Sequence, residues 1–386
     1  MSTTIASQPP HLPRRDLILL PLLNVLTIAF LLIGSEFTAR HFFPESEKGD
    51  PCRVNDATIG FKYRPNCTSR VKSAEGPWVV NQYNDCGYRT RESCGPKPSG
   101  SIRISLIGSS VALGSFVGYN ETWAARAAKD LTRMCGRPVE VQNLGRELCL
   151  PICEFHRMDE ALVLNPDLVV MTVAPYDLEH LVPSEGSGGD KSIPSKHAPN
   201  GIPEKRSILK SAQTLVTKSR AVTVVEHFLF QDPSTYAHLY LAYRDKADFL
   251  RSPLSPAWEQ RLAGFELLLG EMAERFHAAH VPFVLIEMPS VAQVSVLALN
   301  NRPPKVDPYA LNQRLTEISS RHGIQFVSGL DAFRQAPGSN KFFYMVDGHM
   351  NEEGHALVSG QLVDQLTQGL NPALSGCSEP QKIAHQ

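Results

Sequence analysis

The chain has 386 residues, of which 42% are hydrophobic, so it can bury one substantial core with a smaller appended region. The formal net charge is −1, and no stretch is rich in lysine or arginine. These properties exclude a nucleic-acid partner, which would need a basic surface.

The N-terminal region contains a charge-free apolar run, Leu17 to Gly34, that is long enough to cross a bilayer. Arg14 and Arg15 precede it, and the positive-inside rule keeps them in the cytoplasm. We therefore expect a cytoplasmic tail (1–16), a transmembrane anchor (17–37) and an extracytoplasmic remainder, which is periplasmic in a Gram-negative bacterium. A cleaved signal peptide is the alternative, but residues 35–38 offer no clear small-residue cleavage site.

The 8 cysteines are compatible with an oxidising compartment. Their spacing is too irregular for a zinc ribbon, and the nearby histidines complete no ligand set, so disulfides or free buried thiols are expected and no metal. The nearest pairs in sequence are Cys86 with Cys94 and Cys149 with Cys153.

Residues 38–100 are rich in Gly, Pro and Asn, which predicts a lead-in of loops and a few short strands. Residues 101–370 change character and alternate short apolar runs with longer helical patterns. This alternation predicts an α/β domain with a parallel sheet and helices on both faces. The expected strands are 102–107, 139–141, 168–171, 283–286 and 324–327, and the expected helices are 122–134, 258–279, 308–321 and 352–367.

Residues 183–250 interrupt this rhythm as an insertion, and residues 371–386 form a C-terminal tail. The part from 183 to 206 is rich in Gly, Pro and Ser and reads as a mobile loop, whereas 207–250 reads as helical. Tyr236, Tyr240 and Tyr243 recur at helical spacing there. We interpret this stripe as packing, with a lid or carbohydrate-facing wall as the alternative.

Two distant segments contain residues suited to nucleophilic catalysis. Ser110 follows the expected strand 102–107 at a glycine-framed turn, which would present its hydroxyl at the carboxyl edge of the sheet. Asp347 and His349 share one loop near the end of the chain, where the carboxylate can orient the imidazole that accepts the serine proton. His355 reads as a packing or capping residue of the last helix.

These segments occur in the order typical of the SGNH/GDSL hydrolase superfamily, and the sequence resembles its membrane-anchored cell-envelope branch over about residues 80–370. The matching segments are 107–114, 143–145, 166–170, 347–355 and an upstream Asn84-x-x-Gly-aromatic-Arg89 segment. The resemblance implies a three-layer α/β/α, flavodoxin-like parallel sheet. It also implies a triad of Ser110, Asp347 and His349, with no cofactor.

The sequence departs from the family pattern at two positions. Ser109 stands where Asp or Gly is usual, and Tyr176 replaces the asparagine of the oxyanion hole that is expected before Asp177. The backbone N–H groups of Ser110 and Gly145 would remain as oxyanion donors, with Tyr176 a doubtful third.

Three functions follow from the resemblance. The first is a serine esterase that removes O-acyl groups, with acetyl expected, from an envelope glycan, and another ester substrate is the alternative. The second is an O-acyltransferase that uses the same triad, and the third is a catalytically weak glycan-binding or assembly protein. The sequence names no protein partner.

Overall fold

The computed structural model describes residues 15–43, 49–181, 219–336, 338–368 and 371–377. The chain divides into two compact units, one of residues Met1–Glu45 and Pro203–Glu226 and the other of Ser46–Ile202 and His227–Gln386. The smaller unit contains helix α1 (Asp16–Phe42), which is long and apolar enough to cross a membrane. Glu36 of α1 accepts hydrogen bonds from the backbone N–H groups of Arg220 and Ala221, at the start of α8 (Arg220–Leu229).

The larger unit is built on a five-stranded parallel sheet in the order β6-β5-β7-β8-β9. This is the flavodoxin-like order, in which the second of the sheet's five strands along the chain, β6, lies at one edge. The predicted fold class is therefore confirmed. The strands are β5 (Ile102–Ile107), β6 (Val139–Asn143), β7 (Leu168–Val173), β8 (Phe283–Glu287) and β9 (Gln325–Ser328).

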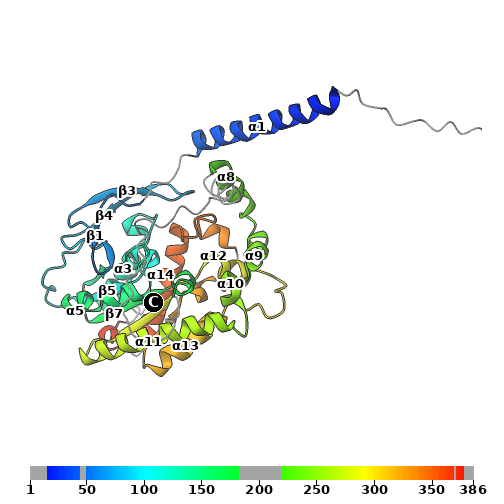
Figure 1. Ribbon diagram of the computed structural model, residues 1–386. Helices are drawn as coiled ribbons and strands as arrows, with labels where there is room; N and C mark the ends of the chain where they lie inside the picture. The colour runs from blue at the N-terminus through cyan, green and yellow to red at the C-terminus, as the bar shows by residue number, and fades with distance from the viewer. Residues whose placement is uncertain (1–14, 44–48, 182–218, 337, 369–370, 378–386) are drawn as a thin grey trace, which may run out of the picture. The chain divides into compact units, whose positions relative to one another are not determined.

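Helices cover both faces of this sheet because its strands alternate apolar side chains between two buried clusters. One face packs against α5 (Met158–Val163), α11 (Pro256–Ala278) and α13 (Ala310–Arg321), and α11 and α13 lie together in Figure 1. The other face packs against α3 (Trp123–Cys135) and α14 (Glu352–Gln368). The other helices among the described residues are α2 (Ser110–Leu113), α4 (Pro151–His156), α6 (Pro175–Glu179), α9 (Pro233–Leu241), α10 (Arg244–Ala247) and α12 (Val291–Leu297), with 3₁₀ turns at Tyr119–Glu121, Asp248–Leu250, Gly329–Phe333, Ser339–Lys341 and Pro372–Leu374.

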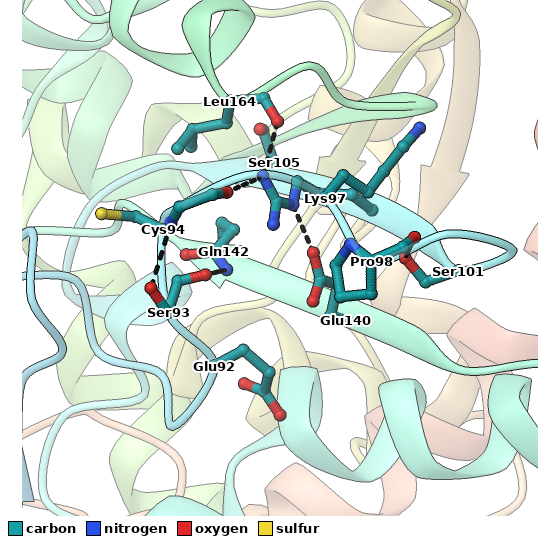
Figure 2. Close-up of polar contacts among 12 residues, drawn as sticks. Glu92, Ser93, Cys94, Lys97, Pro98, Ser101, Ser105, Glu140, Gln142 and Leu164 are labelled. Atoms are coloured by element: carbon teal, nitrogen blue, oxygen red, sulfur yellow. Dashed lines mark hydrogen bonds and ion pairs between the residues drawn. The ribbon is translucent and has the colours of Figure 1, made fainter.

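Two antiparallel hairpins precede the sheet. They pair β1 (Arg53–Asp56) with β2 (Gly60–Tyr63) and β3 (Thr68–Lys72) with β4 (Trp78–Gln82). Polar contacts join the segment between β4 and β5 to the sheet (Figure 2). Buried Arg103 donates to the Glu140 carboxylate and to the carbonyl oxygens of Gly95, at 2.9 Å, and Leu164, at 2.8 Å.

All 8 cysteines are paired. The bonds are Cys52–Cys67, Cys86–Cys94, Cys135–Cys377 and Cys149–Cys153. The two pairs expected from nearness in sequence are thus confirmed.

The expected loop at 183–206 and the first part of the expected helical stretch, 207–218, lie outside the described residues. From residue 220 the insertion is helical, and the rings of Tyr236 and Tyr240 are stacked 6.0 Å apart against buried apolar residues. Packing therefore explains these two tyrosines, whereas Tyr243 is exposed.

Candidate active site

The turn after β5 places Ser110 at the carboxyl edge of the sheet. Gly108 has a φ of +155°, and a Cβ at this position would lie 2.1 Å from Thr172 Oγ1, so no larger residue fits. Ser109 then precedes the short helix α2, of which Ser110 is the first residue. As a first helical residue, Ser110 has a backbone N–H without an intrahelical acceptor.

Arg89 lies in the segment before the sheet and contacts the loop that follows Ser110. It is 1% exposed. Its guanidinium donates to the carbonyl oxygens of Leu113, Gly114 and Val117. The loop that follows Ser110 is therefore fixed by a residue outside the predicted triad, and the resemblance supplied the sequence signal for it.

The loop before α14 carries the other two predicted residues. An isolated β-bridge joins Phe343 to Met350, and the N–H of Tyr344 donates to the carbonyl of His349 at 2.9 Å. Gly348 has a φ of +90°, which suits glycine in the tight turn between Asp347 and His349.

The structure brings Ser110, His349 and Asp347 together. Nε2 of His349 lies 2.8 Å from Ser110 Oγ, and Nδ1 lies 2.6 Å from Asp347 Oδ1. The ring of Phe116 meets the imidazole edge-on, with ring centroids 5.1 Å apart. The imidazole is thus held on one side by a carboxylate and faces the serine hydroxyl on the other.

The predicted oxyanion donor Gly145 is in contact with the nucleophile turn but its N–H is engaged. A Cβ on Gly145 would lie 2.4 Å from the backbone N of Leu113. Its N–H donates to Asn143 Oδ1 at 2.9 Å, while Asn143 Nδ2 donates to the carbonyl of Ala112 at 2.8 Å. To donate to an oxyanion, the Gly145 N–H would have to break its hydrogen bond to Asn143 Oδ1.

Tyr176 lies on α6 and is 52% exposed. Its ring packs against His180, with centroids 4.3 Å apart, and its carbonyl lies 2.9 Å from His180 Nδ1. The hydroxyl has no hydrogen-bond partner within the described part of the chain. The Tyr176 ring is therefore oriented by packing against His180, and not by a hydrogen bond from its hydroxyl to a described residue.

Two buried acids lie beneath the nucleophile turn. Asp177 Oδ2 accepts from Ser109 Oγ at 3.1 Å and from the N–H of Ala174 at 2.8 Å. Burial raises the pKa of Asp177 to about 6. Burial and the neighbouring Asp177 raise the pKa of Glu154 well above its ordinary value, and neither Glu154 oxygen has a hydrogen-bond partner among the residues described.

His355 is a structural residue, as expected. Its Nδ1 accepts from the backbone N–H of Trp123, the first residue of α3, at 3.1 Å. Burial lowers the pKa of His355 to about 3, so the ring is neutral and can accept this bond.

No family model and no curated protein matches the sequence. Solved structures with a similar fold include a lipolytic protein of the G-D-S-L family from Desulfitobacterium hafniense, with 11% identity, a TM-score of 0.36 and coverage of 68% of this chain and 98% of that one. A lipase/acylhydrolase from Enterococcus faecalis is 14% identical, with a TM-score of 0.37 and coverage of 69% of this chain and 95% of that one. An acetyl xylan esterase is 10% identical, with a TM-score of 0.37 and coverage of 68% of this chain and 98% of that one. These are distant likenesses of fold, so the function proposed below depends on the geometry of this chain's own residues.

Proposed function

We propose that the protein is a serine esterase with Ser110 as nucleophile. The observation that supports this most directly is the continuous contact from Ser110 Oγ through His349 to Asp347, at 2.8 Å and 2.6 Å. Both distances fall in the range that proton transfer and imidazole orientation require.

The reaction has two halves. Ser110 Oγ attacks the ester carbonyl while His349 Nε2 takes the hydroxyl proton, and Asp347 stabilises the resulting imidazolium. His349 then gives that proton to the departing alcohol, which leaves an acyl group on Ser110. A water molecule, deprotonated by His349, attacks the acyl-serine and releases the carboxylic acid and free Ser110.

The oxyanion of each tetrahedral intermediate would be stabilised by the backbone N–H of Ser110, with Gly145 and Tyr176 as further candidates. The Gly145 N–H is engaged by Asn143, and Tyr176 replaces the family's asparagine. Loss of one oxyanion donor typically costs about 2.7–4 kcal/mol. We therefore expect slower turnover than a complete oxyanion hole would give, which also favours a catalytically weak glycan-binding protein as the second candidate.

The substrate class that we propose is an O-acylated envelope glycan, with acetyl as the acyl group. This follows from the resemblance to envelope-facing hydrolases, together with the apolar helix α1 and the disulfides, which suit an oxidising compartment. In this proposal α1 anchors the chain and the catalytic unit is extracytoplasmic. A sugar hydroxyl in place of water would make the same triad an O-acyltransferase.

The test is turnover of a chromogenic acetyl ester by the full chain in detergent, with and without oligosaccharide acceptors. Ser110→Ala should abolish most turnover, by a factor of about 10⁴ or more where the triad acts as a unit. Ser115→Ala is the matched control, because the Ser115 hydroxyl is buried nearby and has no hydrogen-bond partner within the described residues. Undiminished turnover by Ser110→Ala would refute the assignment, and acyl transfer that outpaces hydrolysis would identify a transferase.

A further inference from the structure

We propose that Glu75 is a positioning residue for the loop that carries Asp347 and His349. This inference deepens the proposed esterase function and rests on it. Glu75 lies in the turn between β3 and β4, within the segment that the sequence marks only as a lead-in.

The carboxylate of Glu75 directly contacts the loop that carries Asp347 and His349, which we call the catalytic loop. Oε2 accepts from the backbone N–H of Val346 at 2.7 Å and of Asp347 at 3.2 Å. Oε1 lies 2.6 Å from His227 Nδ1, and the Glu75 side chain is only 4% exposed. The buried carboxylate therefore has a partner on each oxygen, and two of its three contacts with described residues are to the catalytic loop.

The local sequence around Glu75 fixes this carboxylate. The hydroxyl of Ser73 accepts from the backbone N–H groups of Glu75, at 3.3 Å, and Gly76, at 2.7 Å, which closes the turn. A Cβ on Gly76 would lie 2.8 Å from Cζ of Tyr344, so this turn is packed against the catalytic loop.

The bonds within the catalytic loop set its shape but not its distance from Ser110. The bridge between Phe343 and Met350 and the bond from the Tyr344 N–H to the His349 carbonyl are internal to it. Glu75 supplies a contact from outside. The same stretch of chain continues to Arg89, which binds three carbonyl groups of the nucleophile turn. Residues 73–89 thus contact both of the loops that carry the proposed triad, Glu75 the loop of Asp347 and His349 and Arg89 the loop that follows Ser110.

Removal of this contact should act on the rate of the chemical step. A displacement of about 1 Å in a catalytic group can cost about a hundredfold in rate. We expect Glu75→Ala to lower kcat for a chromogenic acetyl ester by about tenfold to a hundredfold while KM stays near its original value.

Two conservative variants separate the carboxylate's position from its charge. Glu75→Gln keeps an oxygen at the same reach and loses the charge, so it should retain most of the turnover. Glu75→Asp keeps the charge but is one methylene shorter, so it should lose turnover although it is expected to fold. The matched control is Asp56→Ala, because Asp56 also accepts backbone N–H groups in a hairpin turn, those of Thr58 and Ile59, without contacting the catalytic loop.

The experiment measures kcat per active site in the full chain, with sites counted by covalent labelling of the nucleophilic serine with a fluorophosphonate probe. A positioning role predicts the order wild type, Gln, Asp, Ala for kcat per labelled site, with Asp56→Ala equal to wild type. Equal kcat per labelled site in all variants, with only the number of sites reduced, would show that Glu75 serves folding alone and overturn the proposal. Failure of the esterase function itself would be seen separately, as turnover that persists in Ser110→Ala.

Discussion

Replacement of Asp177 by asparagine should make the protein more stable at neutral pH and reduce the pH dependence of its stability. Asp177 is 2% exposed, and burial raises its pKa from 3.8 to about 6. Asparagine can keep an oxygen for the Ser109 hydroxyl and the Ala174 N–H, and it carries no charge into the buried site.

The sign and size of the effect follow from proton linkage. The unfolded chain releases the Asp177 proton near pH 4, whereas the folded protein keeps it until about pH 6. The folding free energy contributed by this proton is therefore complete below pH 4 and is lost as the pH rises through 6. A shift of about 2 pKa units at about 1.4 kcal/mol each corresponds to about 3 kcal/mol.

Urea unfolding of the full chain in detergent, followed by tryptophan fluorescence at pH 4, 6 and 8, measures this directly. The unfolding free energy of Asp177→Asn minus that of the wild type should rise by about 3 kcal/mol between pH 4 and pH 8. The subtraction cancels other buried acids with the same sign, such as Glu287, whose pKa burial raises to about 7. A difference that stays constant across this range would show that Asp177 ionises normally, and would refute the reasoning.

Two further predictions concern the departure at Tyr176 and the N-terminal helix. The Tyr176 hydroxyl has no hydrogen-bond partner among the described residues and the side chain is 52% exposed, so Tyr176→Phe should leave ester turnover unchanged. Tyr176→Asn should raise turnover, by at most the factor of about 10²–10³ that one oxyanion donor contributes. A fall in kcat for both variants would instead identify the hydroxyl as a working donor. If α1 is an uncleaved anchor, the intact mass of the protein extracted from membranes should include residues 1–34, and a mass that begins near Ser35 would indicate a signal peptide.

The parts of the fold that were predictable from sequence are those specified by local pattern. The apolar run at Ile102–Ile107, bounded by Gly108, predicted β5 and the nucleophile turn because a buried parallel strand needs apolar side chains on both faces. The spacing of Asp347 and His349 likewise predicted their contact, since both lie on one loop. The pairing of Cys135 with Cys377 was not predictable, because 242 residues separate the two cysteines and only the folded sheet brings them together.

The parts of the site that sequence reasoning missed depend on contacts between distant segments. Glu75 meets Val346 across 271 residues, and nothing in the turn that holds Glu75 indicates this partner. The engagement of the Gly145 N–H by Asn143 was also unexpected, although both residues belong to the same matched segment. A motif specifies which residue types are present, whereas the acceptor that each N–H finds depends on the packed backbone.

These contacts change the interpretation of the segment before the sheet. Its composition predicts loops and short strands, and in the structure its apolar side chains contribute to two small clusters, with Tyr63 and Tyr83 in one and Ile59 in the other. Its polar side chains also bind the two turns that carry the proposed triad, Arg89 the turn after Ser110 and Glu75 the loop of Asp347 and His349. Because these turns belong to different elements, their separation is set by their direct contacts, such as the Tyr344 hydroxyl that donates to the Phe116 carbonyl at 3.4 Å, together with the segment that contacts both of them. The described residues 49–101 therefore belong with both turns of the proposed triad, in agreement with a larger compact unit that begins at Ser46.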